Sequence, residues 1–191
     1  GIAVSNPSEV VRMSRSRFVV SPMVATFNKA TKSEAEKIGI VATPCQAMAL
    51  AKMRWKSYLK DEGGINKLHL VVGLFCGWAL SWRELKTLLA NRIGDELVVG
   101  IDIPPSKYNS MEVYTKKNGV VQISLDDVLP CVKQSCQYCF DMTAEFSDIS
   151  VGSARCPEGW EEARQWNQVI VRTHLGEELL QLAKNKGMLE F

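Results

Sequence analysis

Three of the six cysteines lie close together in the stretch LPCVKQSCQYCFDM, at Cys131, Cys136 and Cys139. Cys136 and Cys139 form a C-x-x-C pair, a spacing that lets two thiolates from one tight turn bind the same metal centre. A redox disulfide or a structural zinc site can use the same pair, so the pair alone leaves several chemistries open. Cys131 extends the run to C-x4-C-x2-C, which matches the front of the plant-type iron-sulfur spacing. A fourth ligand has to come from another part of the chain.

Cys45 is a candidate ligand at the start of a predicted helix. It lies in KIGIVATPCQ, where the apolar run Ile38–Ala42 predicts a strand. Thr43 is then the N-cap, Pro44 occupies the first helical position and Gln46 completes a capping box. In the first helical turn, free backbone N–H groups and the positive end of the helix dipole favour a thiolate over a thiol.

Cys76 is a second candidate ligand, and it follows another apolar run. It ends the stretch KLHLVVGLFC, which predicts a buried strand with the cysteine at its carboxyl end. Open α/β sheets bind their ligands at such strand ends. The sequence therefore offers two strand-end thiols in addition to the C-x-x-C pair.

These motifs in their order resemble a known family. TPCQ after one strand, GLFC after the next, and a C-x-x-C followed by AEFSDISVG are similar to the beta subunits of coenzyme F-420 (F420)-reducing hydrogenase and of F420-linked formate dehydrogenase. Ala42 stands where the family usually has a glycine before TPCQ. The resemblance runs from Glu36 to the C-terminus. It implies an iron-sulfur flavoprotein in which a 4Fe-4S cluster moves single electrons, FAD collects two, and a hydride passes to or from coenzyme F-420.

The resemblance also implies roles for individual residues. The family's recurring cysteines, the ligands of one 4Fe-4S cluster, correspond to Cys45, Cys76, Cys136 and Cys139. Cys131 and Cys156 have no counterpart, and we expect them to be buried small side chains or surface thiols. Residues near the expected FAD site are Thr43, Gln46 and Gly152, the last because glycine lets a backbone approach a ligand closely. The implied partners are the catalytic and electron-transfer subunits of a hydrogenase or dehydrogenase.

Two other classes of protein remain open from the residues themselves. In one, the same four thiolates close a tetrahedral zinc site that only stabilises the fold. In the other, Cys136 and Cys139 form a thiol-disulfide pair, with Cys45 as an activated thiol at a helix start.

The composition is that of an ordinary globular protein. Of the 191 residues, 46% are hydrophobic and 23% charged, and a net charge of +2 gives no case for nucleic acid as a partner. The sequence contains neither a signal-peptide pattern nor an apolar run of membrane-spanning length. Cysteines clustered like metal ligands, rather than spread as a disulfide framework, indicate a reducing and hence cytoplasmic compartment.

The elements that must position these thiols predict an α/β fold, with a mixed, mostly parallel sheet, crossover helices and an antiparallel β-hairpin. Strands are expected at 38–42, 68–75, 97–103, 148–152 and 167–173. Helices are expected at 33–37, from Pro44 to at least residue 58, from a capping box at Ser81 to residue 93, and at 175–186. The segments 111–114 and 120–123 alternate around an Asn-Gly turn and form the hairpin. Trp55 is expected to face the core.

The resemblance also divides the chain into two regions. Residues 1–35 form no complete unit, and we interpret them as an incomplete N-terminal continuation. The family's glycine-rich segment, which helps to hold the flavin, is not found in this sequence. Residues 36–191 are expected to form the iron-sulfur and flavin electron-transfer domain.

Overall fold

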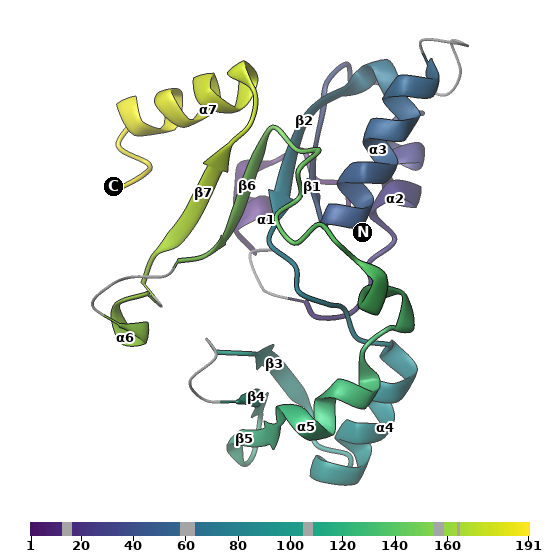
Figure 1. Cartoon of the computed structure of the whole chain (residues 1–191), viewed down its shortest axis with the longest axis vertical. Helices are drawn as coiled ribbons and strands as arrows, with labels where there is room; N and C mark the ends of the chain where they lie inside the picture. Colours follow the sequence, from purple (N-terminus) through teal and green to yellow (C-terminus); the bar gives the residue numbers. More distant parts are fainter. Residues whose placement is uncertain (13–16, 58–63, 105–108, 155–158, 164) are drawn as a thin grey trace.

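The structure is a computed structural model, and it describes residues 1–12, 17–57, 64–104, 109–154, 159–163 and 165–191. Two sheets lie one above the other in Figure 1. The upper sheet has the order β1-β2-β6-β7, with β1, β2 and β6 parallel and β7 antiparallel to β6; its strands are β1 (Ile38–Ala42), β2 (Leu68–Leu74), β6 (Ile149–Ser153) and β7 (Asn167–Val171). The predicted mixed and mostly parallel sheet is therefore confirmed.

The lower sheet is antiparallel, with the order β3-β4-β5, and its strands are β3 (Val98–Asp102), β4 (Ser110–Thr115) and β5 (Gly119–Ser124). The predicted hairpin is β4 with β5, and Gly119 at its turn has a φ of 71°, a conformation that suits glycine. The strand predicted at 97–103 is β3, and it pairs with β4 in antiparallel register. It therefore joins this hairpin and not the parallel strands.

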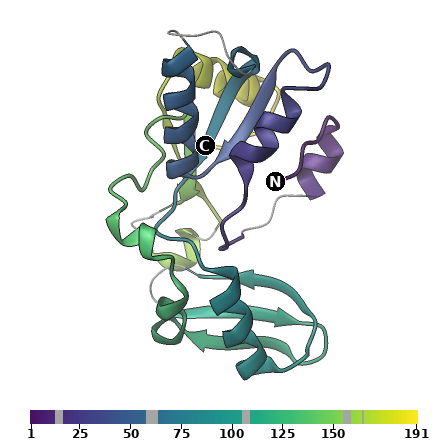
Figure 2. The same ribbon diagram turned by 90° about the vertical axis from the view of Figure 1, so that its right-hand side faces the viewer.

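Helices cover one face of the upper sheet. The helices α2 (Met23–Ala30) and α3 (Pro44–Ser57) lie together on this side in Figures 1 and 2, while α1 (Pro7–Arg12) is exposed. The 3-10 turn η1 (Ile65–Lys67) precedes β2. The first core, which these elements share, comprises Phe27, Ile40, Ala42, Ala47, Leu50, Ile65, Leu68, Val71 and Ala144.

Two expectations for this region are wrong. The helix predicted at 33–37 is replaced by turns and bends, and the helix lies earlier, at α2. Phe27 explains the difference, because it is only 2% exposed and anchors α2 in the core, whereas the stretch SEAEK has only one alanine to bury. Trp55, expected to face the core, is 71% exposed. The boundary near residue 36 stays a prediction, although Phe27 already packs with residues beyond it.

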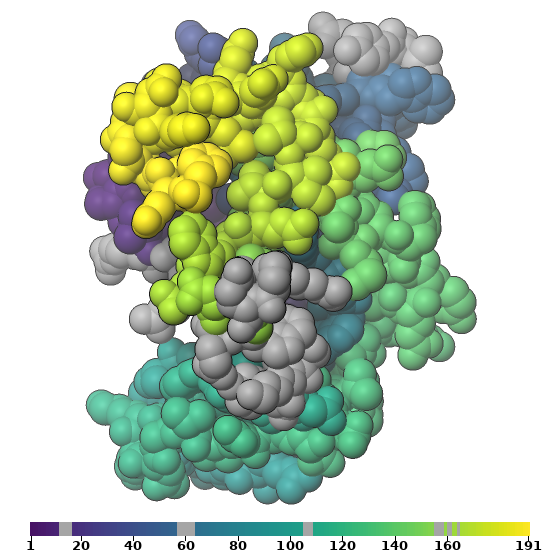
Figure 3. Space-filling view, turned by 60° about the vertical axis from the view of Figure 1, so that its left-hand side comes forward, coloured from purple at the N-terminus to yellow at the C-terminus, as the bar shows by residue number. Residues whose placement is uncertain are grey.

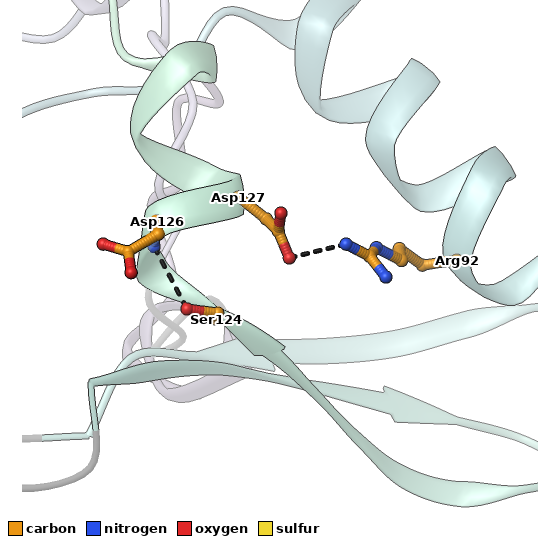
Figure 4. A network of polar contacts seen from close by, with 4 residues as sticks. All are labelled: Arg92, Ser124, Asp126 and Asp127. Atoms are coloured by element: carbon orange, nitrogen blue, oxygen red, sulfur yellow. Dashed lines mark hydrogen bonds and ion pairs between the residues drawn. The ribbon is translucent and has the colours of Figure 1, made fainter.

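The lower sheet has a core of its own. The helices α4 (Trp82–Ile93) and α5 (Leu125–Val128) pack beside it, followed by the 3-10 turns η2 (Leu129–Cys131) and η3 (Gln134–Tyr138). This second core comprises Leu80, Leu85, Leu89, Met111, Val113, Ile123, Val128 and Cys131. Ser81 is the N-cap of α4, but its side chain makes no capping hydrogen bond, so the predicted capping box does not form. Arg92 reaches from α4 to Asp127 of α5, with 2.6 Å between Nη2 and Oδ2, as Figure 4 shows.

The C-terminal part closes the far edge of the upper sheet. It comprises α6 (Trp160–Ala163), β7 and α7 (His174–Asn185), which agrees with the predicted final strand and helix. The hydroxyl of Thr173 caps α7 by accepting the N–H of Gly176 at 3.2 Å. Figure 3 shows this C-terminal segment on the surface above the lower sheet. Within the described residues, no helix combines the length and the apolar character needed to cross a membrane.

Candidate metal centre

Two of the four predicted ligands lie just beyond the carboxyl ends of neighbouring strands in the upper sheet. β1 and β2 are neighbouring parallel strands, with Ala42 opposite Gly73, so the segments that follow them leave from one edge. Cys45 lies in the first turn of α3 directly after β1. Cys76 comes two residues after the end of β2. Their shared position follows from the parallel register.

The start of α3 has part of the predicted capping box. The backbone N–H of Thr43 donates to Oε1 of Gln46 at 3.0 Å, as a capping box requires. The hydroxyl of Thr43 lies 3.4 Å from Sγ of Cys45. The other end of the Gln46 amide donates to the carbonyl of Ser21 at 2.6 Å. Gln46 therefore fixes the turn that presents Cys45.

The C-x-x-C pair is held against the segment after β2. Cys136 lies in η3 and Cys139 is its C-cap. The N–H of Ala79 points at Sγ of Cys136 at 3.4 Å, and the carbonyl of Ala79 accepts the N–H of Lys133 at 2.9 Å. The N–H of Cys76 donates to the carbonyl of Met142 at 2.9 Å. These links bring the pair to the edge where Cys76 lies.

Cys76 lies within electrostatic range of the other three predicted ligands. The pKa of Cys76 is raised to about 11, first by burial and then by the negative charges of Cys45, Cys136 and Cys139. Both causes disfavour a thiolate at this position. The other three predicted ligands thus lie within electrostatic range of Cys76, while the convergence of all four on one metal centre stays a prediction. Cys131 lies apart in the second core, where it is 5% exposed, and burial raises its pKa. Cys156 lies outside the described residues.

The donor set fits an iron-sulfur cluster by its chemistry. Four cysteine thiols are the usual ligands of a 4Fe-4S cluster, in which each sulfur binds a different iron. A single zinc ion instead draws its ligand sulfurs to about 2.3 Å from one centre. In the part of the chain that the structure describes, no group of three or more His, Cys, Asp or Glu side chains is arranged to hold a metal ion. The fit to a 4Fe-4S cluster therefore rests on the number and kind of the four predicted donors.

Residues 35–191 match the family described as the C terminus of the coenzyme F420 hydrogenase/dehydrogenase beta subunit. The chain belongs to this family. The family resemblance predicted from the motifs is thus confirmed.

Several proteins that are similar to this chain have names that refer to coenzyme F420. The chain is 32% identical to a coenzyme F420 hydrogenase subunit beta from Methanococcus voltae, over 97% of this chain and 63% of that protein. It is 28% identical to a coenzyme F420-dependent sulfite reductase from Methanocaldococcus jannaschii, over 93% of this chain and 28% of that protein. A chain from a solved F420-reducing NiFe hydrogenase complex of Methanosarcina barkeri superposes with a TM-score of 0.80 and 26% identity, over 96% of this chain and 60% of that one. The chain thus spans less than two thirds of the length of each of these relatives.

In this family member, Gly152 has a packing role. A Cβ at this position would overlap the ring of Phe75, which lies directly on the glycine. The absence of a side chain at Gly152 therefore makes room for Phe75. A contact of Gly152, Thr43 or Gln46 with FAD stays a prediction.

The loop after the C-x-x-C pair is held in place by one of its own acidic side chains. The buried carboxylate of Asp141 accepts the N–H groups of Thr143 and Glu145, each at 3.0 Å. Ala144 has a φ of 54°, which a non-glycine residue rarely adopts. A Cβ on Gly73 would overlap that of Ala144, so the glycine lets the loop pack onto β2. A glycine inside a predicted strand was the only available signal of this close approach.

Proposed function

We propose that this chain is the electron-transfer part of an oxidoreductase subunit that passes electrons between a 4Fe-4S cluster, FAD and coenzyme F-420. The cluster ligands would be Cys45, Cys76, Cys136 and Cys139. The observation that carries this proposal is the meeting of three segments. The register of β1 and β2 places Cys45 and Cys76 after neighbouring strand ends, and the contact of Ala79 with Cys136 holds the C-x-x-C pair against the segment after β2. Membership of the F420 hydrogenase/dehydrogenase family supports the link to F420.

Two of the proposed ligands, Cys136 and Cys76, differ in how the surrounding chain holds them. When bound, a cluster would supply one-electron transfer. The backbone N–H of Ala79 donates to Sγ of Cys136 at 3.4 Å and so holds that sulfur against the segment after β2. Cys76 is a neutral thiol at pH 7 in the free chain, because its pKa is about 11. Binding of a cluster therefore has to release the proton of Cys76.

We propose that FAD approaches the edge formed by Thr43, Gln46 and Gly152, and that this chain alone does not enclose it. A pocket must bury most of a cofactor to bind it tightly. The relatives are longer than this chain, which covers 63% of the Methanococcus voltae protein. Tight FAD binding and hydride transfer to or from coenzyme F-420 would therefore require the family's N-terminal part. The same proposed chemistry would serve a formate dehydrogenase as well as a hydrogenase, and we propose a cytoplasmic location for it.

We propose that catalytic and electron-transfer subunits of a hydrogenase or dehydrogenase dock beside the C-x-x-C pair. Tyr138 is 80% exposed, Phe140 83% and Met142 60%, and all three flank the cysteine pair. Clustered exposed apolar side chains of this kind are typical of protein interaction sites. A short path from a partner to the four thiols would begin there.

Anaerobic analysis of iron, sulfide, zinc and flavin in the purified chain tests the proposal. We expect iron and sulfide in the one-to-one ratio of a 4Fe-4S cluster, brown colour and little FAD. Zinc without sulfide would contradict the electron-transfer function and favour a structural site. Tight, stoichiometric FAD would contradict the view that this chain does not enclose the flavin.

A further inference from the structure

Arg172 lies behind the loop that follows the C-x-x-C pair. It comes directly after β7, and its backbone N–H donates to the carbonyl of Asp148 at 3.0 Å. Its side chain is partly buried and reaches two different segments. Nε donates to the hydroxyl of Ser150 at 3.0 Å. Nη2 donates to the carbonyl of Thr143 at 3.1 Å and to its hydroxyl at 2.8 Å.

These contacts begin a chain of hydrogen bonds that ends on Ala144. Ser150 accepts from Arg172, and its own hydroxyl hydrogen can go to the hydroxyl of Ser147 at 2.9 Å or to the carbonyl of Ala144 at 3.3 Å. Ser147 in turn donates to the carbonyl of Ala144 at 2.6 Å. Ser147 and Ser150 are buried, at 4% and 0% exposure, so these bonds are shielded from water. The chain ends on Ala144, whose left-handed conformation persists only where its surroundings hold it.

The loop held in this way links two of the grouped cysteines. Thr143 directly follows Met142, whose carbonyl accepts the N–H of Cys76 at 2.9 Å. One residue earlier, the carbonyl of Asp141 lies 3.3 Å from Sγ of Cys139. Arg172 thus holds Thr143, which is the neighbour of the residue that accepts the N–H of Cys76. A displacement of Thr143 would be transmitted to that link through a single peptide unit.

The contacts require an arginine and not only a positive charge. Within the described ranges the ion pairs are Arg92 with Asp127 and His174 with Glu177, and the oxygens that Arg172 contacts are neutral. A guanidinium offers several donors in a rigid planar fork, so one side chain can serve Ser150 and Thr143 together. A lysine ammonium has no such fork and cannot serve both segments in the same geometry.

We propose that Arg172 is a positioning residue for the four-cysteine centre. It clamps the loop 141–147 onto β6 and so fixes the carbonyl of Met142 under the N–H of Cys76. The purpose of the clamp rests on the proposed function, but the clamp itself is a property of the chain without any cofactor.

Hydrogen exchange of the whole chain tests the clamp. In Arg172→Gln, we expect the amide of Cys76 to exchange at least about tenfold faster than in the wild type, with amides of β4 and β5 unchanged. Arg172→Lys should give an intermediate rate. Arg92→Gln is the matched control, because it removes the same charge at the lower sheet and should leave the Cys76 amide unchanged. A second readout is the electron paramagnetic resonance signal of the reduced, iron-loaded chain, which should broaden in Arg172→Gln at equal iron content.

The outcomes separate the two proposals. If Arg172→Gln exchanges like the wild type at Cys76, the clamp is overturned. If it speeds exchange equally in both sheets, Arg172 only stabilises the whole fold and the proposal is again overturned. If the wild type takes up no iron, the proposed function fails, while the exchange rates still decide whether Arg172 fixes the loop.

Discussion

The two sheets give their cysteines opposite surroundings. Cys131 and Cys136 are separated by four residues, yet Cys131 is 5% exposed in the apolar second core while Cys136 faces a backbone N–H and other thiols. The plant-type spacing would treat both as ligands. The spacing of cysteines in the sequence therefore does not decide which of them are candidate ligands, whereas their surroundings in the fold do. A thiol is a candidate ligand where backbone donors and further thiols meet it, as they do at the edge of the upper sheet.

The sheets also differ in what they bury. The loop and strand behind the cysteine site bury Asp141, Ser147, Asp148 and Ser150, all hydrogen-bonded. The lower sheet buries fewer polar side chains, Ser110 and Thr115 of β4, beside an apolar core around Met111 and Val113. Among the described residues, Oγ of Ser110 has no hydrogen-bond partner. Buried polar groups are costly unless they are paired, so their concentration behind the cysteines indicates a loop held in one defined position.

Matched alanine substitutions at one glycine in each sheet should show the largest difference between the two sheets. In Gly73→Ala, the new methyl group overlaps Ala144 and would lie 2.6 Å from Oγ of Ser147, so the loop must move. We expect the free energy of unfolding in urea to fall by about 1–3 kcal/mol, the usual cost of overpacking.

The control for this change is Gly100→Ala in the lower sheet. There the nearest atom to the new methyl would be Cδ2 of Tyr114 at 3.6 Å, an ordinary contact. The free energy of unfolding should change by about 0.5 kcal/mol or less. Equal losses in the two variants would show that the loop does not pack on Gly73 as described.

The pH dependence of alkylation tests the surroundings of Cys76. Its folded pKa is raised to about 11 from an ordinary value of 9.0, so the reactive thiolate is scarcer at every pH below 11. In the cofactor-free chain, iodoacetamide labelling of Cys76, followed by peptide mass spectrometry, should speed up about tenfold per pH unit until about pH 11. In the urea-unfolded chain the rate should level off near pH 9.0. Identical profiles would mean that neither burial nor the neighbouring thiols raise the pKa of Cys76.

The smallest effect is expected at the surface ion pair of the lower sheet. Arg92 and Asp127 have side chains that are 50% and 42% exposed, so water screens their attraction. Arg92→Gln should lower the free energy of unfolding by about 0.5 kcal/mol or less in urea. A loss above about 1.5 kcal/mol would indicate that this pair does more than an exposed salt bridge can.

Local patterns predicted most of the elements. Apolar runs located the parallel strands, and the turn at Asn118 and Gly119 located the hairpin. The assignment of Cys45, Cys76, Cys136 and Cys139 to one centre came from the family resemblance, and it stays a prediction. The helix α2 was missed because its anchor, Phe27, is identified only by the core that it enters.

The clamp at Arg172 was not predictable for a related reason. Arg172 contacts Ser150, 22 residues away, and Thr143, 29 residues away, and neither contact belongs to a short motif. Likewise, the pattern at Ser81 predicted a capping box whose side-chain hydrogen bond the fold does not form. Contacts between distant segments depend on the assembled sheet, which no local pattern specifies.

The central claim is that Cys76 belongs to a metal centre and Cys131 does not. The most direct test is the iron content of Cys76→Ser and Cys131→Ser after identical anaerobic reconstitution of the full chain with iron and sulfide. We predict that Cys76→Ser loses most of its iron, while Cys131→Ser keeps the wild-type amount. A loss of about a quarter or more in Cys131→Ser, with Cys76→Ser unaffected, would contradict the account and return the site to the plant-type spacing.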